Sequence, residues 1–182
     1  MQVVPSREDA AARRVMALGG DAVRACFPLR RQMPRKTAGE WGIATDLLFP
    51  GYLFLASDDP EAVAHVLRRS TQPDLVLSAD GSLAVLTDAE AALVRALGGE
   101  EGVVRVSRGA IEGGRLAVAS GPLAGLEGLV CHVDRHRRAA WLDPSRADEV
   151  LLGRAPGAAA GTLALPADAR GLKVGLEVVS KS

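Results

Sequence analysis

The sequence predicts an α+β protein in which a domain of mixed helices and strands precedes a small all-β domain. Amphipathic helical segments alternate with short strand-like segments in the first half of the chain. Helical periodicity then stops, and short strand candidates follow one another between turns. The glycines Gly109, Gly113 and Gly114 predict a linker where this change occurs. We therefore predict an α/β sandwich, an antiparallel sheet with helices, over residues 1–108 and a five-stranded β-barrel over residues 109–182.

Composition gives no sign of a generally basic protein. The chain has 182 residues, 48% of them apolar, and its 22 Lys or Arg residues balance 22 Asp or Glu residues. Neither predicted domain is basic by itself, since residues 1–108 hold 13 basic and 14 acidic side chains and residues 109–182 hold 9 and 8. A nucleic-acid function must therefore depend on a local cluster of charge.

The residues do not predict an enzyme, a cofactor or a metal site. His132 and His136 are four residues apart but span a strand end and a turn, so they do not form a helical metal pair. No glycine-rich phosphate loop and no nucleophile elbow is present in the sequence. Cys26 and Cys131 are far apart in apolar runs, which is typical of reduced core cysteines. Because there is also no apolar run of about 18 residues, we expect a cytoplasmic monomer with no membrane contact.

Three helices are predicted in the first domain from their start signals. Ser6 with Asp9 resembles a capping box, Asp59-Pro60 supplies a cap followed by proline at the first helical position, and Thr87 with Glu90 forms a second capping box. Helix ends are predicted at Gly19-Gly20, at Arg68-Arg69 and at Gly98-Gly99. The strand candidates around them are Gln2–Pro5, Val23–Leu29, Leu75–Leu77 and Val103–Val106.

The stretch Arg30–Gly42 combines four basic side chains with the breakers Pro34 and Gly39. It predicts a two-stranded excursion or a mobile loop. Two interpretations stay open, a solvated surface loop and a loop that contacts phosphate groups.

The stretch Asp46–Ser57 is the most apolar part of the chain and contains two of its three phenylalanines and its single tyrosine. Pro50-Gly51 lies inside it, and because proline cannot donate to a strand ladder, a bulge or an edge position is expected there. Either the stretch is a buried strand with a bulge, or one of its faces is exposed as an apolar docking patch.

In the second domain, Gly121-Pro122 predicts a turn, and Gly153–Gly161 predicts a flexible insertion. The five strand candidates are Arg115–Ala119, Leu126–Asp134, Ala139–Leu142, Thr162–Leu165 and Leu172–Val179.

The main candidate for function is the basic turn that follows the second of these strands. Arg135, His136, Arg137 and Arg138 are consecutive, and arginine offers a planar fork to phosphate and stacks on bases. A solvated hairpin turn is the alternative. Arg108, Arg115 and Lys181 would widen the cluster if the barrel brought them together. A loop of this kind suits structured RNA, whose backbone and unstacked bases a small barrel can reach.

Two motifs resemble the NusG family of transcription elongation factors. Leu48–Phe54 resembles the FPGY-containing strand of the family's N-terminal NGN domain, and Leu116–Leu142 resembles its KOW motif, a β-turn-β unit with a Gly-Pro-apolar loop. The two motifs occur in the family's order. The run that begins at Gly121-Pro122 and ends in the basic turn resembles the LoaP branch of specialised paralogues in particular.

This resemblance implies an antitermination factor with two binding activities. Its NGN domain would bind the clamp helices of RNA polymerase, with non-template DNA as a further candidate partner. The implied polymerase contacts are Phe49, Pro50, Tyr52, Phe54, Arg69, Ser70 and Thr71, the last three within the loop Arg69–Pro73. Its KOW domain would bind a nascent RNA hairpin through the RNA-binding residues Arg108, Arg115, Arg135, His136, Arg137, Arg138 and Lys181, and transcription would then continue through terminators in long operons.

The resemblance has two departures and leaves two alternatives. The first strand lacks the family's frequent aromatic pair, and Asp143–Arg170 is longer than this barrel needs. One alternative is a general NusG factor whose KOW domain binds proteins. The other is a ribosome-associated KOW protein that binds RNA, although such proteins are usually strongly basic.

Overall fold

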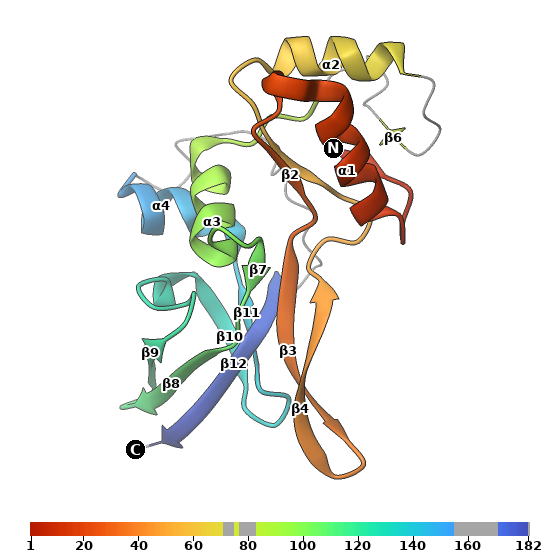
Figure 1. Cartoon of the computed structure of the whole chain (residues 1–182). Coiled ribbons are helices and arrows are strands. Elements are labelled where there is room, and N and C mark those ends of the chain that lie inside the picture. Colours follow the sequence, from red (N-terminus) through yellow and green to blue (C-terminus); the bar gives the residue numbers. More distant parts are fainter. Residues whose placement is uncertain (71–74, 77–82, 155–170, 182) are drawn as a thin grey trace. The chain divides into compact units, whose positions relative to one another are not determined.

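The computed structural model describes residues 1–70, 75–76, 83–154 and 171–181, in an α+β arrangement of helices and several small sheets (Figure 1). The chain forms two compact units. Unit 1 combines Met1–Leu29 with Phe49–Val85, and unit 2 combines Arg30–Leu48 with Leu86–Ser182. This division differs from the predicted one, because the segment Arg30–Leu48 belongs to the same unit as the C-terminal half.

The helices and strands have the following bounds. The helices are α1 (Glu8–Gly19), α2 (Pro60–Arg69), α3 (Asp88–Gly98) and α4 (Ala147–Leu152). The strands of unit 1 are β1 (Gln2–Val3), β2 (Ala25–Phe27), β5 (Phe54–Ala56) and β6 (Leu75–Val76). The strands of unit 2 are β3 (Arg30–Thr37), β4 (Glu40–Leu47), β7 (Val103–Val104), β8 (Ser107–Glu112), β9 (Arg115–Ser120), β10 (Val130–Asp134), β11 (Ala139–Leu142) and β12 (Leu172–Lys181). No described helix is long and apolar enough to cross a membrane.

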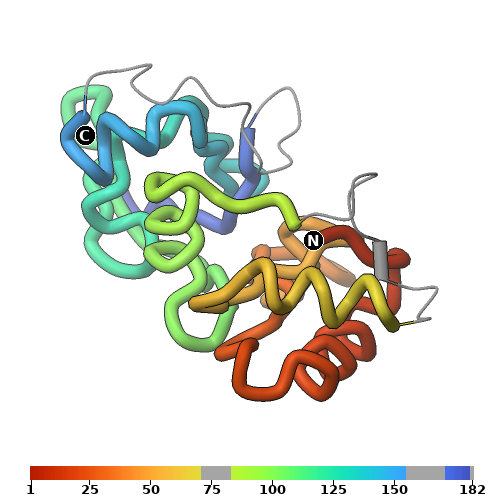
Figure 2. The backbone as a smooth tube through the Cα atoms, turned by 90° about the horizontal axis from the view of Figure 1, so that it is seen from above, coloured from red at the N-terminus to blue at the C-terminus, as the bar shows by residue number. Residues whose placement is uncertain are grey.

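Unit 1 packs two helices on two antiparallel strand pairs. β1 pairs with β6 and β2 pairs with β5, while α1 and α2 lie next to each other (Figure 2). The predicted start of α2 is confirmed, because the Asp59 side chain accepts a hydrogen bond from Ala62 N at 2.9 Å and Pro60 occupies the first turn. Val15 of α1 and Val63 of α2 are fully buried in one apolar cluster, which explains why these short helices pack together.

The capping box predicted at Ser6 is wrong. α1 begins at Glu8 without a side-chain cap, and Ser6 has a positive φ of 69°. The Glu8 side chain is buried instead, where its Oε1 accepts a hydrogen bond from Gly51 N at 2.8 Å. Burial raises the pKa of the Glu8 carboxyl, but hydrogen bonds from the backbone amides of Gly51, Glu8 and Ser6 outweigh this effect and hold the pKa below its ordinary value.

The apolar stretch Asp46–Ser57 is two strands and not one bulged strand. β4 ends at Leu47, β5 begins at Phe54, and the backbone between them turns at Gly51, which has a φ of 78°. Proline and glycine together therefore end one strand and allow the next to begin in the other unit.

Unit 2 contains a long hairpin and a curled five-stranded sheet. β3 and β4 form an antiparallel hairpin, and β7 pairs with β3 in parallel. The five-stranded sheet has the order β10-β11-β12-β8-β9, in which β12 and β8 are parallel. The capping box at Thr87 and Glu90 is confirmed at the start of α3, which lies beside α4 (Figure 1). Arg30–Gly42 was predicted to be a two-stranded excursion or a mobile loop, and the structure shows the two-stranded excursion.

Three expectations for the second half are corrected or untested. Gly109 of the predicted linker lies in strand β8, and Gly113 and Gly114 form the turn between β8 and β9, so the predicted boundary after residue 108 falls inside a strand. Helical structure does not stop after Ser107, because α4 follows β11. Strand hydrogen bonds among the described residues leave β9 and β10 as the two edges of the sheet and do not close it into a barrel. The predicted strand Thr162–Leu165 and most of the predicted insertion Gly153–Gly161 lie outside the described residues.

The β3–β4 hairpin packs directly on β12. Arg31 donates a hydrogen bond from Nη1 to the carbonyl oxygen of Lys173 at 2.7 Å. Gly175 leaves room for this approach, because a Cβ atom at its position would lie 2.5 Å from the carbonyl oxygen of Gln32. Met33 is buried with Trp141 of β11. These contacts place the basic hairpin beside the end of the sheet that carries the turn between β10 and β11.

Candidate nucleic-acid interface

The basic turn is a short, well-bonded connection between β10 and β11. Asp134 and Ala139 are the last paired residues of the two strands, which leaves residues 135–138 as the turn. Arg138 N donates to the carbonyl oxygen of Arg135 at 3.3 Å, and Arg137 N donates to the Asp134 carboxylate at 3.0 Å. These bonds orient the turn's side chains outward, and Arg135, His136 and Arg137 are all exposed.

Arg138 differs from the other three residues of the turn. Its guanidinium lies 4.1 Å from the centroid of the Trp41 ring on the β3–β4 hairpin, and its Nη1 donates to the Glu177 carboxylate at 2.7 Å. The side chain is half-buried as a result. Arg138 therefore connects the turn to both the β3–β4 hairpin and β12, and its positive charge is largely compensated by Glu177 and the Trp41 ring.

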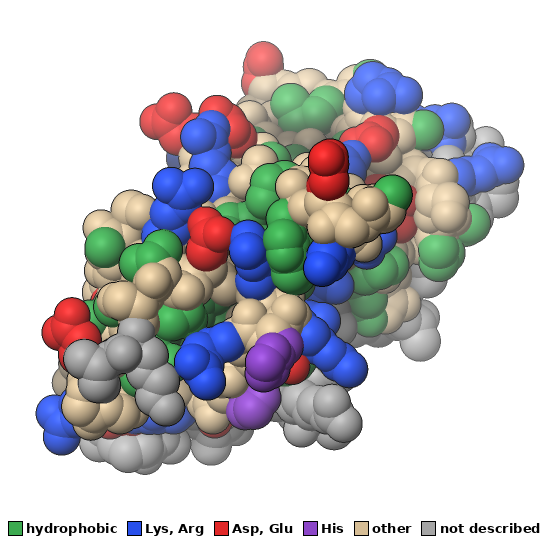
Figure 3. All heavy atoms as spheres, turned by 90° about the horizontal axis from the view of Figure 1, so that it is seen from below, with side chains coloured by type: hydrophobic (Ala, Val, Ile, Leu, Met, Phe, Trp, Pro, Cys, Tyr) green, Lys and Arg blue, Asp and Glu red, His purple; other side chains and the backbone are tan. Residues whose placement is uncertain are grey.

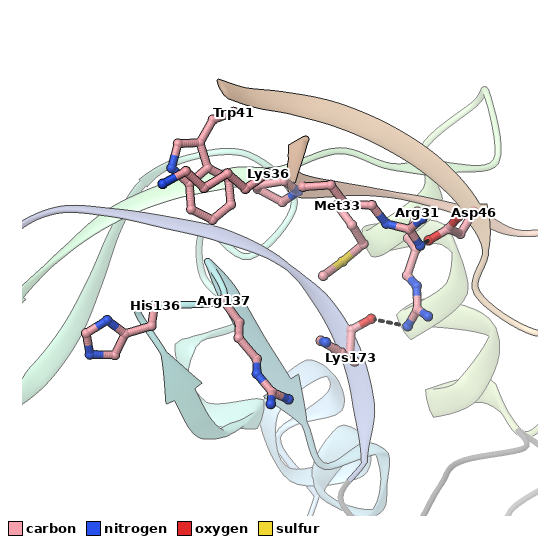
Figure 4. Close-up of a pocket in the computed structure, with 10 residues that line it drawn as sticks. Arg31, Met33, Lys36, Trp41, Asp46, His136, Arg137 and Lys173 are labelled. Atoms are coloured by element: carbon pink, nitrogen blue, oxygen red, sulfur yellow. Dashed lines mark hydrogen bonds and ion pairs between the residues drawn. The ribbon is translucent and has the colours of Figure 1, made fainter. Parts of the chain in front are cut away.

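A groove of about 410 Å³ lies between the turn, the β3–β4 hairpin and β12 (Figure 4). In the close-up, Trp41 and Lys36 lie on one side and His136 and Arg137 on the other, and Lys173 lies beyond Arg137, next to Arg31. The groove is lined by Arg31, Met33, Pro34, Arg35, Lys36, Trp41, Asp46, His136, Arg137 and Lys173. We call this the cationic groove.

The cationic groove concentrates positive charge in a chain whose formal net charge is zero. Five of its lining residues are Lys or Arg, and one is a carboxylate, Asp46, which pairs with Arg35 at 2.6 Å. Burial, followed by the charges of Arg137 and Arg31, lowers the pKa of Lys173. The contribution of Arg137 and Arg31 reflects a positive local potential that would stabilise an anion, whereas the larger contribution of burial does not. The space-filling view from below shows Lys and Arg side chains gathered around histidines (Figure 3).

The structure brings Arg108 toward the turn but not Arg115. Arg108 Nε lies 3.2 Å from the same Glu177 carboxylate that binds Arg138. Arg115 is the strand partner of Glu112, next to the turn of the β8–β9 hairpin and at the far end of the sheet. Along β12, Gly175 pairs with the start of β11 and Lys181 pairs with Ile111. These six steps correspond to roughly 20 Å, so the backbone of Lys181 lies at the same far end as Arg115.

The residues predicted to bind polymerase lie in different environments. The Phe49 and Phe54 rings are buried, with centroids 5.5 Å apart, so these two rings belong to the core and not to an exposed face. Pro50 is exposed, and Tyr52 is half-buried with its hydroxyl accepting a hydrogen bond from Gln2 at 2.9 Å. Arg69 is exposed, Ser70 Oγ donates to the Leu67 carbonyl at 2.9 Å, and Thr71–Pro73 lie outside the described residues.

Sequence reasoning missed part of the cationic groove. Arg31, Arg35 and Lys36 lie in the basic stretch for which a phosphate-contacting loop was one open interpretation, but they were not assigned to the same site as the turn. No pattern in the sequence pointed to Lys173, because a single lysine at the start of a strand is common. Trp41 was not assigned to the site either. A tryptophan within a basic stretch is nevertheless a signal that could have indicated a nucleic-acid contact.

The structure describes no group of three or more His, Cys, Asp or Glu side chains that could hold a metal ion in residues 1–70, 75–76, 83–154 and 171–181. No protein-family model matches the chain, and a search of curated protein sequences finds no match.

Proposed function

We propose that this protein is a transcription elongation and antitermination factor that binds nascent RNA through unit 2 and RNA polymerase through unit 1. The observation that carries the RNA half is the cationic groove, in which basic side chains from two separate strands, β3 and β12, and from one turn line a single surface. Chain-wide basicity cannot account for it, because the formal net charge is zero.

Aromatic groups beside the cations favour RNA over a simple anion. Arg138 lies over one face of the Trp41 ring, but the side chain is still 40% exposed at the cationic groove, and exposed indole surface can stack on an unpaired base. Lys36 lies opposite Trp41 on the neighbouring strand of the β3–β4 hairpin, so its ammonium group can contact a phosphate next to the base that stacks on Trp41. Loops and ends of RNA hairpins present unpaired bases and phosphates in this combination.

The polymerase half is supported by the resemblance of Leu48–Phe54 to the FPGY strand, and its most accessible aromatic group is Tyr52. Tyr52→Ala is expected to weaken association with purified RNA polymerase while leaving RNA affinity unchanged. Gln2→Ala removes only the hydrogen bond to the Tyr52 hydroxyl and serves as the matched control. Loss of both activities in Tyr52→Ala would mean that the substitution had unfolded the protein.

The proposal is tested as a whole by transcription through a terminator in a purified system. Readthrough should increase when the protein and a template encoding a leader hairpin are both present. It should decrease with Arg137→Ala. Equal readthrough with and without the leader hairpin, at an intact fold, would contradict an RNA-dependent antiterminator.

A further inference from the structure

A second pocket lies on the other side of Arg137. It has a volume of about 410 Å³ and is lined by His132, Asp134, Arg137 and Trp141. Arg137 therefore lines both this pocket and the cationic groove. We call the second one the β10 pocket.

The β10 pocket follows from strand geometry. His132 and Asp134 are two residues apart on β10 and project from one face, and His132 is paired with Trp141 across to β11. The His132 and Trp141 rings have centroids 5.1 Å apart and are tilted by 56°. Trp141 is 5% exposed, so the imidazole of His132 is the more accessible ring of the wall.

Two polar groups stand side by side at the pocket. Arg137 Nε lies 3.7 Å from Asp134 Oδ2, while Asp134 Oδ1 is fixed by the backbone amide of Arg137. The same amide, as the largest cause, holds the pKa of the Asp134 carboxyl below its ordinary value. Within the part of the chain that the structure describes, the Nη atoms of Arg137 make no hydrogen bond, and the side chain is 68% exposed.

We propose that the β10 pocket binds an unpaired guanine base of the RNA held by the cationic groove. Guanine presents the acceptors N7 and O6 directly beside its N1–H and N2–H donors. An arginine fork next to a carboxylate matches this order, because Arg137 can donate to the acceptors while Asp134 accepts from the donors. The His132 ring supplies a surface for stacking.

Other bases fit this pair less well. Adenine and cytosine each offer one exocyclic amino group to the carboxylate and leave the arginine fork with a single neighbouring acceptor. Uracil offers one N–H donor. The β10 pocket would therefore determine base preference, and the cationic groove would determine general RNA affinity. The guanine site rests on the proposed RNA-binding function.

The test measures fluorescence anisotropy of the full-length protein with labelled heptaribonucleotides. The probes are oligouridines whose central residue is uridine, adenosine, inosine or guanosine. We expect the guanosine probe to bind about tenfold more tightly than the adenosine probe. Inosine lacks the exocyclic amino group and should fall between the two.

Asp134→Asn isolates the carboxylate, because asparagine can still accept from Arg137 N and keep the turn. It should reduce the guanosine preference to within about twofold without weakening the binding of oligouridine. Asp143→Asn is the matched control. Like Asp134, Asp143 accepts a hydrogen bond from a nearby backbone amide, that of Ser145 at 3.0 Å, but it lies outside the pocket. His132→Ala should weaken the guanosine probe more than oligouridine.

The outcomes separate the two levels of the proposal. Salt-sensitive binding of all four probes with equal affinity would overturn the guanine site and leave the RNA-binding function standing. A guanosine preference that survives in Asp134→Asn would also overturn it. Absence of binding to every probe and to hairpin RNA would remove the proposed function and the guanine site together.

Discussion

The dependence of RNA affinity on salt gives the sharpest test of the cationic groove. Each phosphate contacted on a single strand contributes about −0.7 to the slope of log Kobs against log salt. The groove holds five Lys or Arg side chains, of which Arg35 is neutralised by Asp46. With an RNA whose unpaired bases include no guanine, the other four side chains can each contact a phosphate, and the groove then contributes a slope of about −2.8.

Single substitutions should change this slope in equal steps. Arg137→Ala and Lys36→Ala come from the turn and from the β3–β4 hairpin, and each should reduce its magnitude by about 0.7. The double variant should lose about 1.4 if both side chains contact the same RNA. Arg115→Ala removes an exposed arginine at the far end of the sheet and should leave the slope unchanged.

The assay is anisotropy titration of a labelled RNA hairpin over a series of salt concentrations, with circular dichroism as the check on folding. A slope near zero would refute the electrostatic reasoning. An effect of Arg115→Ala equal to that of Arg137→Ala would show that the RNA lies along the sheet and not in the groove. An effect of Arg137→Ala on the slope without any effect of Lys36→Ala would show that Lys36 of the β3–β4 hairpin does not contact the RNA.

Three further results are expected. Glu8→Gln should destabilise the protein. Because the pKa of the Glu8 carboxyl is lowered in the folded state, the difference in free energy of unfolding between the variant and the wild type should shrink as the pH falls from about 5 through that pKa. A difference that does not depend on pH would contradict this. Cys131 is exposed and does not lie in the core as the sequence predicted. A thiol reagent at about pH 8 should therefore modify Cys131 rapidly and Cys26 slowly, because burial raises the pKa of Cys26 to about 11; a fast phase that remains in Cys131→Ser would refute this. Gly175→Ala should lower RNA affinity by separating the hairpin from β12, since the added Cβ would meet the Gln32 carbonyl oxygen; unchanged affinity and stability would show that this contact is dispensable.

Local signals correctly predicted two of the three expected helix starts and several strands. Asp59-Pro60 and the Thr87–Glu90 pair act through neighbouring backbone amides, so their effect can be inferred without knowledge of the tertiary structure. Ser6 with Asp9 fails for the opposite reason. Glu8 makes a buried hydrogen bond to Gly51, 43 residues away, and this contact fixes where α1 begins.

The candidate site was only half predictable. The charge of the turn Arg135–Arg138 is visible in the sequence, because four basic or titratable residues are consecutive. The other half depends on β3 packing against β12, which is a tertiary contact permitted by the missing side chain of Gly175. A sequence pattern cannot show that residues 31–36 and residue 173 meet, since more than 130 residues separate them.

Arg138 is the case in which sequence and structure assign different roles to one residue. In the sequence it is the last member of a cationic cluster, yet its guanidinium is bound to Glu177 and lies over Trp41. It also has a φ of 48°, and its carbonyl oxygen accepts from Leu176 N at 3.0 Å. Arg138 thus acts as a positioning residue that holds the turn against β12 and the hairpin.

This role predicts a pattern that a direct phosphate contact would not produce. Arg138→Ala should lower the free energy of unfolding by about 1–2 kcal/mol, because it removes a half-buried ion pair and a cation–π contact, and it should weaken RNA binding as a consequence. Arg135→Ala, which removes an exposed arginine from the same turn, should weaken binding with no change in stability. Arg138→Lys should restore the charge but not the planar stacking on Trp41, so its stability should stay below that of the wild type. If Arg138→Ala weakened binding as strongly as Arg137→Ala but left the thermal unfolding midpoint unchanged, Arg138 would be an RNA contact, and the turn would be held in place by its backbone bonds alone.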